Sequence, residues 1–493
     1  MHSERRTDHP DKNALIQQFS AFLSNAAILA DPEDLKPYAC DGLSAYQKIP
    51  WLVVLPDTVD QVRKVMRICS REGVPVVARG AGTGLSGGAL PVKNGVLLGL
   101  AKFNKILDID ALNRTARVQP GVRNLAISEA SKPYGLYYAP DPSSQIACTI
   151  GGNVAENSGG VHCLKYGLTV HNVLQLSIVT VDGELVTIGG SGLDSPGFDL
   201  LALLTGSEGM LGVIVEVVVK LLPKPQATQI LLASFDSVEK AGRAVAAVIS
   251  AGHLPAGLEM MDNAAIRAVE DFVEIGYPLD AEAILLCELD GASESLAEEV
   301  AAVKSLLLAV AATEVRIACD DNEKQRFWAG RKAAFPAMGR ISPDYLCMDG
   351  TIPRQHIGSV LTQINDLSKH YGFHVANVFH AGDGNLHPLI LYDANSPGEQ
   401  EQAEVLGGEI LALCVKVGGV ITGEHGVGVE KLNQMCIQFS PQELTQFHAV
   451  KSAFDPEGLL NPGKAIPTLR RCAEFGAMHV HSGKLPHPEL ERF

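Results

Sequence analysis

The sequence predicts an α+β fold divided into at least two domains, and three observations lead to this prediction. With 493 residues, of which 46% are hydrophobic, the chain is too long for one ordinary core. From Gly95 to about Pro223, short β-branched runs are broken by Gly, Asn and Asp. Beyond Pro223-Lys-Pro225, strands alternate with amphipathic helices, which predicts a second α+β domain with a ferredoxin-like arrangement.

The individual elements follow from the spacing of apolar residues. Apolar residues recur at helical spacing over 57–69 and the pattern ends near Gly73, which predicts a helix followed by a strand over 74–78. Before the boundary, further strands are predicted at 96–98, 116–118, 174–181 and 213–222. Beyond it, strands are predicted at 230–235, 283–289 and 315–317, and helices at 238–249 and 300–311.

The composition argues against several classes of partner. A formal net charge of -16 disfavours nucleic acid, because binding to phosphates depends on Lys and Arg. The polar N-terminus does not match a secretory signal, and apolar runs such as 306–312 are too short to span a bilayer. We therefore expect a cytoplasmic protein without a nucleic-acid partner and without direct membrane insertion, attached to a membrane only through partner subunits.

The cysteines are scattered singly, and the chain has no Cys-x-x-Cys pair. They lie at positions 40, 69, 148, 163, 287, 319, 347, 414, 436 and 472. This pattern argues against an iron–sulfur cluster or a zinc ribbon in this chain. We expect all ten to be reduced and to pack as small hydrophobic residues.

The densest glycine cluster is Arg79-Gly-Ala-Gly-Thr-Gly-Leu-Ser-Gly-Gly-Ala89. It contains G-x-G-x-x-G over 82–87, but a Rossmann glycine turn opens a helix, whereas Pro91 follows here and the chain resumes as a strand. The loop is therefore predicted to lie between strands. Its backbone N–H groups and the hydroxyls of Thr83 and Ser86 suit a pyrophosphate, and the alternative is a plain surface turn.

Later segments also place small residues and amides where a flat ligand could approach. These segments are Pro140-Asp-Pro-Ser-Ser144, residues 149–160 with Lys165-Tyr-Gly167, and residues 205–213. Four motifs resemble, in their order and spacing, the FAD-binding domain shared by vanillyl-alcohol oxidases and p-cresol methylhydroxylases. They are R-G-x-G-T-x-x-S-G-G, P-D-P-S, I-G-G-N-V-A-x-N-x-G-G and G-S-E-G-x-L-G.

The resemblance implies a p-cresol methylhydroxylase-type FAD-binding domain, with the first loop at the pyrophosphate and the later segments beside the ribityl chain and isoalloxazine. Members with covalent FAD often supply a His in or near the first loop; residues 79–89 contain none, so non-covalent FAD is implied. The residues that the resemblance assigns to FAD binding are Arg79, Gly80, Ala81, Gly82, Thr83, Gly84, Ser86, Gly87, Gly88, Pro140, Asp141, Ser143, Gly151, Gly152, Asn153, Ala155, Asn157, Gly160, Glu208, Gly212, Ile214 and Asn461.

A second group of polar residues lies in His380-Ala-Gly-Asp-Gly-Asn-Leu-His387 and Gly423-Glu-His-Gly-Val-Gly428. This pattern predicts a site for a divalent metal, zinc or manganese, whose protein ligands are His380, His387 and Glu424. Three protein ligands leave further coordination positions of the metal open. The metal could bind the hydroxyl and carboxylate of a 2-hydroxy acid while His425 accepts the hydroxyl proton. The alternative is that one or both His are hydrogen-bonded core residues.

Arg331 is a candidate anchor for the substrate carboxylate. Phe327, Arg331, Ala334 and Met338 fall on one face of a predicted helix, so a guanidinium interrupts an apolar stripe. A buried Arg requires an anion opposite it, which is either the substrate or an Asp or Glu of the chain. Both alternatives are open from the sequence.

The C-terminal motifs, with the closing segment 454–464, resemble the D-lactate and D-2-hydroxyglutarate dehydrogenase branch of the same superfamily. The resemblance implies oxidation of glycolate to glyoxylate, with D-lactate as a second substrate. It also implies a second flavin-domain-like subunit and an iron–sulfur subunit that receive the electrons. Branch members acting on dicarboxylates place a Thr and a Lys where this chain has Phe335 and Cys347 or Met348, which fits a small monocarboxylate.

The resemblance divides the chain into an N-terminal helical segment, an FAD-binding domain, a substrate or cap domain, a C-terminal return to the FAD-binding domain and an extended tail, a candidate subunit contact. Their ranges are 1–48, 49–225, 226–425, 426–470 and 471–493. The rival hypotheses are a stand-alone D-lactate or D-2-hydroxyglutarate dehydrogenase, a non-catalytic flavin-binding scaffold subunit, and a metal hydrolase in which the glycine loop is only structural.

Overall fold

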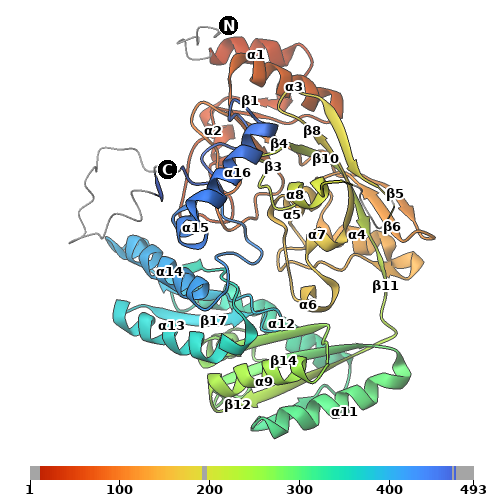
Figure 1. The fold of residues 1–493 in the computed structure, drawn as a ribbon, viewed down its shortest axis with the longest axis vertical. Helices are drawn as coiled ribbons and strands as arrows, with labels where there is room; N and C mark the ends of the chain where they lie inside the picture. Colours follow the sequence, from red (N-terminus) through yellow and green to blue (C-terminus); the bar gives the residue numbers. More distant parts are fainter. Residues whose placement is uncertain (1–10, 191, 193–196, 469–470, 473–493) are drawn as a thin grey trace.

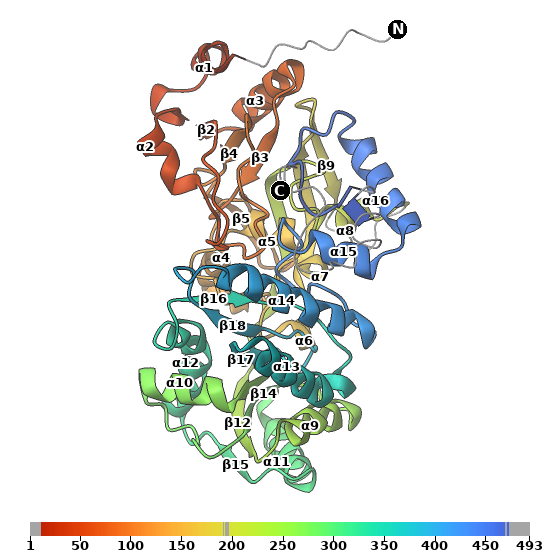
Figure 2. The same ribbon diagram turned by 90° about the vertical axis from the view of Figure 1, so that its left-hand side faces the viewer.

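The computed structural model describes residues 11–190, 192, 197–468 and 471–472. Two halves are stacked along the long axis (Figures 1 and 2). The N-terminal part of the chain builds the upper half, the middle of the chain builds the lower half around one large sheet, and the last helices return to the upper half. The predicted tail falls almost wholly outside the described residues.

The upper half contains two main sheets. The first has the order β1-β2-β4-β3, in which the last three strands are parallel. Its strands are β1 (Ile28–Leu29), β2 (Leu52–Val54), β3 (Val76–Arg79) and β4 (Val96–Gly99). The glycine-rich loop joins β3 to β4, as the sequence predicts. Helix α3 (Val59–Glu72) covers this sheet, begins where Thr58 accepts the Gln61 N–H, and ends at Gly73 as predicted.

The second sheet is antiparallel, with the order β5-β6-β10-β8-β9. Its strands, with the short β7·β11 pair beside it, are β5 (Ile106–Asp110), β6 (Thr115–Val118), β7 (Leu136–Tyr137), β8 (Val173–Val179), β9 (Leu185–Gly189), β10 (Val213–Lys220) and β11 (Leu222–Pro223). The short helices of this half are α1 (Lys12–Ser20), α2 (Pro32–Leu35), α4 (Asn124–Ser131), α5 (Ile150–Glu156), α6 (Cys163–Tyr166), α7 (Thr169–Asn172) and α8 (Leu200–Leu204). Helix α5 lies in a glycine-containing segment for which the sequence predicts no helix.

The lower half is one antiparallel sheet of seven strands, in the order β15-β12-β14-β13-β17-β18-β16. Its strands are β12 (Ala227–Phe235), β13 (Gly257–Asp262), β14 (Ala283–Gly291), β15 (Glu314–Ile317), β16 (Asp344–Cys347), β17 (His374–Phe379) and β18 (Pro388–Tyr392). The order β15-β12-β14-β13 is the ferredoxin-like order that the sequence predicts. Three further strands extend it, because the chain after β15 adds to the same sheet.

Helices cover this sheet. They are α9 (Val238–Ser250), α10 (Asn263–Val273), α11 (Ser293–Ala309), α12 (Asp321–Met338), α13 (Ile357–Tyr371) and α14 (Glu399–Lys416). Two separate apolar clusters form its core, one containing Phe235 and Val245 and the other containing Ile284 and Phe327. The sheet is thus buried on both faces, which makes it a rigid support for residues at its strand ends.

The chain returns to the upper half through α15 (Leu432–Gln438) and α16 (Pro441–Phe454) (Figure 1). Leu459 and Leu460 join the core of the first sheet, and Leu460 pairs with Val76 of β3. Residues far apart in sequence therefore close the upper half, in agreement with the predicted return.

The prediction that all ten cysteines are reduced is wrong for one pair. Cys436 of α15 forms a disulfide with Cys472, with a Cα–Cα distance of 5.2 Å. Thirty-six positions separate them, and only the return of the chain after α16 brings them together. Their spacing in the sequence therefore could not predict the disulfide. Among the other eight, Cys319 is exposed and Cys40 is half-buried, whereas six are buried as expected.

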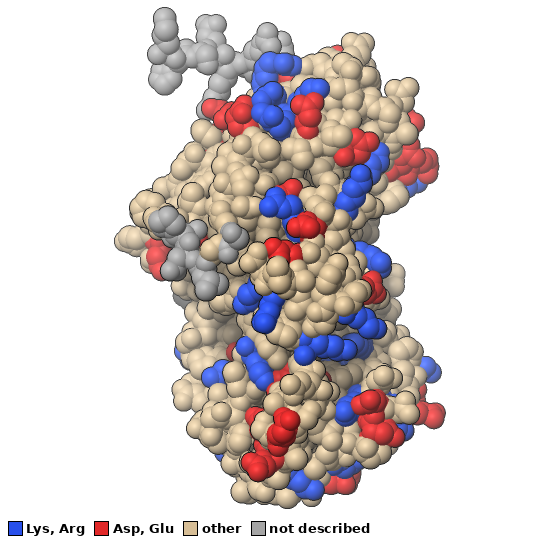
Figure 3. Space-filling view, turned by 90° about the vertical axis from the view of Figure 1, so that its right-hand side faces the viewer, with Lys and Arg blue, Asp and Glu red and all other residues tan. Residues whose placement is uncertain are grey.

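Charged residues of both signs are interspersed over the face in Figure 3, where the molecule narrows between its two halves. The excess of acidic residues is thus not gathered into one patch on this face. None of the helices among the described residues combines the length and the apolarity needed to cross a bilayer.

Candidate active site

One cavity, open to solvent, lies where the two halves meet. The glycine-rich loop and α5 form its upper wall, and Phe335, His387, Glu424 and His425 form its opposite wall. The residues of the predicted FAD set that line it are Arg79, Gly80, Ala81, Gly82, Thr83, Gly84, Gly88, Ser143, Gly151, Gly152, Asn153, Ala155, Glu208, Gly212 and Ile214. The structure therefore brings the two groups of predicted site residues to one place.

The rest of the predicted FAD set lies behind the cavity wall and holds it together. The Ser86 carbonyl accepts the Val429 N–H at 3.0 Å, and Gly87 packs on the Val429 side chain. Asn461 donates its amide to the carbonyls of Gly88 and Glu208. The other members of this group are Pro140, Asp141, Asn157 and Gly160. The Pro140 carbonyl accepts from Asn124, and the Asn157 side chain accepts the Val170 N–H. Asp141 contacts His162, and Gly160 packs against Asp141.

Two buried polar oxygens on the cavity wall have no hydrogen-bond partner among the described residues. They are Oγ1 of Thr149 and Oε2 of Glu156. Buried polar atoms are ordinarily paired, so these atoms fit the wall of a pocket that holds a polar ligand. Together with the converging backbone of the glycine-rich loop, they fit FAD in this cavity.

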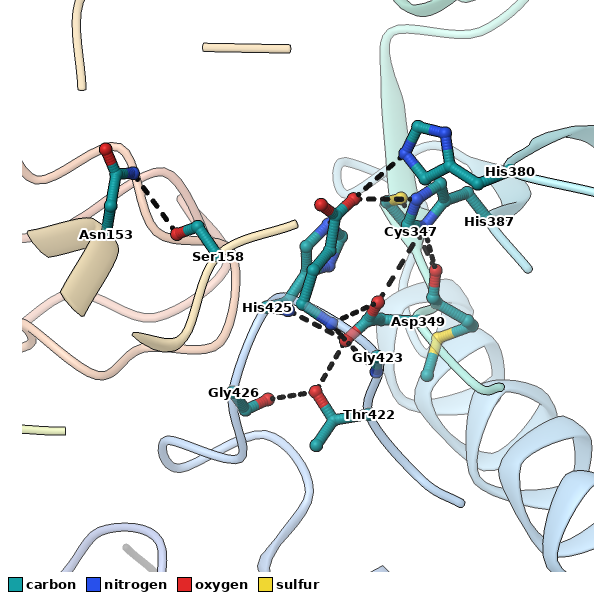
Figure 4. A network of polar contacts seen from close by, with 12 residues as sticks. Asn153, Ser158, Cys347, Asp349, His380, His387, Thr422, Gly423, His425 and Gly426 are labelled. Carbon is teal, nitrogen blue, oxygen red and sulfur yellow. Dashed lines mark hydrogen bonds and ion pairs between the residues drawn. The ribbon is translucent and has the colours of Figure 1, made fainter. Parts of the chain in front are cut away.

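Two imidazoles converge on one carboxylate in the lower wall (Figure 4). The Nε2 atoms of His380 and His387 lie 3.3 and 2.9 Å from Oε1 of Glu424. The chain turns sharply after β17, where the N–H of His380 donates to the Asn385 carbonyl, and this turn brings the two rings to a centroid distance of 5.1 Å. All three side chains are buried, with exposed fractions of 10% or less.

The second nitrogen of each imidazole is also engaged. His380 Nδ1 lies 2.8 Å from Oε1 of Glu259, and His387 Nδ1 lies 3.2 Å from the Met348 carbonyl. Metal-binding histidines show this arrangement, in which the outer nitrogen is held and the inner nitrogen faces the ion. Of the three predicted ligands, His387 and Glu424 belong to a group of described residues close enough to hold one metal ion, whereas His380 contacts Glu424 but lies outside that group.

The charges of this cluster favour a cation. Burial on its own disfavours protonation of His380, but Glu259 and Glu424 raise its pKa well above the ordinary value. Burial on its own raises the pKa of Glu424, but contacts with His380 and His387 hold this pKa well below the ordinary range. Protonated imidazoles thus balance the carboxylate charge in the cluster, and a bound metal ion would take the place of those protons as the positive charge beside Glu424.

His425 differs from the other two imidazoles. Burial lowers its pKa to about 4, so the ring is neutral near pH 7, and its Nδ1 has no partner among the described residues. Its ring stacks on that of His387 at 5.0 Å, and its Nε2 lies 3.9 Å from Glu424 Oε1. A neutral, poorly partnered imidazole on the cavity wall can accept a proton from a bound ligand.

Arg331 does not line the cavity. Its Nε and Nη2 both lie 2.8 Å from Oε2 of Glu259, and both side chains are almost fully buried. Of the two alternatives left open by the sequence, the structure has the ion pair with an acid of the chain. Arg331 therefore supports His380 through Glu259, because the other oxygen of this carboxylate contacts His380.

Two acids of this site were missing from the sequence prediction. Glu259 lies between the buried Leu258 and Met260 of β13, which was the available signal. Asp349, two residues after β16, is completely buried and lies 4.0 Å from His387 Nδ1. Its position near the predicted metal site depends on the pairing of β16 with β18, which no local pattern predicts. Asp349 also groups with His387, Glu424 and His425 as possible metal ligands.

Known proteins share this architecture. The family described as "FAD binding domain" matches residues 50–189, and "FAD linked oxidases, C-terminal domain" matches residues 224–465. The solved structure of p-cresol methylhydroxylase with substrate bound superposes with a TM-score of 0.77 at 19% identity, over 93% of this chain and 97% of that one. Fold and cavity thus define an FAD-dependent oxidoreductase with a p-cresol methylhydroxylase-type FAD-binding domain.

Close relatives narrow the assignment. The Escherichia coli K12 protein named glycolate oxidase subunit GlcD is 65% identical over 98% of this chain and 97% of its own length. A D-lactate dehydrogenase of Anaerostipes hadrus is 33% identical over 91% of this chain and 96% of its own length. The chain belongs to the family of FAD-linked oxidoreductases that contains the GlcD proteins.

Proposed function

We propose that this chain is the catalytic flavin subunit of a 2-hydroxy-acid dehydrogenase that oxidises glycolate to glyoxylate, with D-lactate to pyruvate as a second activity. The observation that carries the proposal is the cavity in which residues 79–85 and Gly88 lie opposite His387, Glu424 and His425. The relatives named glycolate oxidase subunit GlcD and D-lactate dehydrogenase support this substrate class.

The side chains of the lower wall have distinct roles in this reaction. His380, His387 and Glu424 would hold a divalent metal, zinc or manganese, and the glycine-rich loops would hold FAD non-covalently. When bound, FAD supplies the hydride acceptor and the metal supplies a Lewis acid for the hydroxyl and carboxylate oxygens. His425, neutral at pH 7, takes the hydroxyl proton while hydride leaves Cα of the acid.

The cavity wall favours a small monocarboxylate. Phe335 lines the cavity with its ring 6.5 Å from that of His387, so an apolar surface faces the substrate position. Among the described residues that line the cavity, Arg79 is the only Lys or Arg, and it belongs to the glycine-rich loop. A second substrate carboxylate would therefore lack a cationic partner at the lower wall, which favours glycolate and D-lactate over D-2-hydroxyglutarate.

Electrons leave this chain, in our proposal, through a second flavin-domain-like subunit and an iron–sulfur subunit toward the respiratory chain at the inner membrane. The sequence supports a separate carrier of the cluster, because it has no Cys-x-x-Cys pair. Co-purification of the chain with such subunits, and their requirement for quinone reduction but not for flavin reduction, tests this part.

The substrate assignment is tested by anaerobic stopped-flow reduction of the protein-bound flavin. Glycolate, D-lactate, L-lactate and D-2-hydroxyglutarate are compared at saturating concentration. We expect glycolate and D-lactate to bleach the flavin absorbance. Reduction by D-2-hydroxyglutarate alone would contradict the substrate assignment. A flavin that none of the four acids reduces would indicate a non-catalytic scaffold subunit. A purified protein without flavin colour would favour the metal hydrolase.

A further inference from the structure

The turn that carries Glu424 and His425 is held by a buried carboxylate from the lower half. Asp349 accepts the backbone N–H groups of Gly423 at 3.0 Å, Glu424 at 3.2 Å and His425 at 2.9 Å (Figure 4). It also accepts the Thr422 hydroxyl at 2.5 Å. One carboxylate thus fixes the first half of the turn over 422–428.

A second buried carboxylate, from the upper half, holds the remainder of the same turn. Oε1 of Glu208 accepts the Val427 N–H and its Oε2 accepts the Gly428 N–H, each at 2.7 Å. Between the two acids, the Gly426 carbonyl accepts from the fully buried ammonium of Lys431 at 2.9 Å. Charged side chains thus hold five backbone N–H groups and one carbonyl of this turn.

The close fit leaves the turn little freedom of its own. Gly428 has a φ of +52° and lies so near the Ser86 carbonyl of the glycine-rich loop that no side chain fits between them. Glu208 precedes β10 of the FAD-binding half, whereas Asp349 follows β16 of the lower sheet. The two acids thus attach one turn to both halves of the molecule.

We propose that Glu208 and Asp349 are positioning residues that set where the imidazole of His425 stands relative to the flavin-binding wall. The resemblance assigned Glu208 to FAD binding and assigned nothing to Asp349. Charged acceptors hold N–H donors more firmly than neutral ones. A misplacement of about 1 Å costs on the order of a hundredfold in rate. The inference rests on the proposed role of His425 as the base.

The first test uses the isosteric variants E208Q and D349N of the full chain, loaded with FAD and metal. Each replaces a charged acceptor by an amide, which donates as well as accepts. We expect the flavin-reduction rate constant with glycolate, measured per bound FAD, to fall at least about tenfold in each variant. If either protein fails to fold, E208D or D349E replaces it, and the same fall is expected because the shorter or longer acid displaces the turn.

Glu270 provides a matched control. Its carboxylate accepts three backbone N–H groups, from Ile275, Gly276 and Tyr277, in a turn of the lower half that does not line the cavity. E270Q therefore removes a comparable charged acceptor without touching residues 422–428. We expect its flavin-reduction rate constant to equal that of the wild type.

Two readouts separate positioning from general stability. In an H425A background, E208Q and D349N should change the residual rate less than twofold, because the group they position is gone. Amide hydrogen exchange of peptides covering 422–428 should accelerate in E208Q and D349N but not in E270Q. A full tenfold loss that persists in the H425A background would overturn the inference.

The outcomes also separate this inference from the proposed function. Wild-type rates in E208Q and D349N, together with a large loss in H425A, would overturn the positioning role while the function stands. A wild-type rate in H425A would overturn the assignment of the base, and with it both proposals.

Discussion

Gly159 of the FAD-binding half lies directly against Glu424 of the C-terminal half. A Cβ atom built on Gly159 would stand 2.8 Å from Oε2 and 3.1 Å from Cβ of Glu424. Because Oε1 of Glu424 already lies 2.9 Å from His387 Nε2, the acid cannot withdraw without leaving the imidazole. The predicted metal cluster and the flavin-binding segment are therefore fitted to each other through a contact that admits only a hydrogen at residue 159.

The variant G159A tests this contact. Its methyl group should push the Glu424 carboxylate away from both imidazoles, and we expect metal content after dialysis to fall at least about tenfold while bound FAD stays at the wild-type level. Elemental analysis and flavin absorbance measure the two quantities. G291A is the control, because nothing lies within 4 Å of a Cβ at Gly291. Unchanged metal content in G159A would show that Glu424 is not a ligand.

The Arg331–Glu259–His380 chain yields a second prediction. E259Q leaves the buried guanidinium of Arg331 without a carboxylate, and it removes the acid that orients His380. We expect a loss of about 3–5 kcal/mol in the free energy of unfolding and a loss of metal affinity of about 10–100-fold. Denaturant unfolding of the apoprotein and metal titration measure these effects.

A surface ion pair serves as the control for E259Q. Arg117 and Glu216 lie 2.8 Å apart on the second sheet, with 49% and 26% of their side chains exposed. We expect E216Q to cost no more than about 1 kcal/mol and to leave the metal affinity unchanged. Equal losses in the two variants would mean that Glu259 has no special role in the metal cluster.

The contact between the halves should depend on pH through His162. Its Nδ1 lies 2.7 Å from Asp141 of the upper half and its Nε2 lies 3.3 Å from Glu288 of the lower half. Burial alone disfavours the imidazolium, but the two carboxylates raise the pKa of His162 well above its ordinary value. The stability that this charge contributes is fully present below about pH 6.5 and is lost as the pH rises through the raised pKa of the folded state.

The variant H162Q isolates this contribution. We expect the wild type to have the higher Tm at pH 6, and the difference between the two proteins to shrink as the pH rises from 6 to 10. Thermal unfolding in a series of buffers measures it. A Tm difference that is constant across this range would contradict a charged His162 between the halves.

The disulfide is tested by counting thiols. We expect the unfolded, unreduced protein to titrate eight thiols and the reduced protein to titrate ten, because Cys436 and Cys472 are joined. Peptide mass spectrometry should recover the two cysteines in one cross-linked fragment. Ten thiols before reduction would restore the expectation drawn from the sequence.

The glycine-rich loop could be predicted from the sequence because its chemistry is local: consecutive glycines and hydroxyls form one anion-binding loop whatever surrounds them. The same holds for His380, His387 and Glu424, which lie in short motifs. Asp349 could not be found, since its role depends on strands that pair across the sheet.

The anion that pairs with Arg331 likewise could not be identified without the tertiary structure. Its helical face predicted burial, but the acid opposite it comes from β13, 72 residues earlier in the chain. Glu208 shows the reverse case: its motif is recognisable in sequence, yet its carboxylate accepts two N–H groups of a turn more than two hundred positions away.

The most direct test of the account is single-turnover reduction of bound FAD by glycolate in H425A, followed anaerobically. The account predicts a rate constant at least about a hundredfold below that of the wild type, with FAD and metal contents unchanged, because the neutral imidazole on the cavity wall is the proton acceptor. Flavin reduction at the wild-type rate would contradict it.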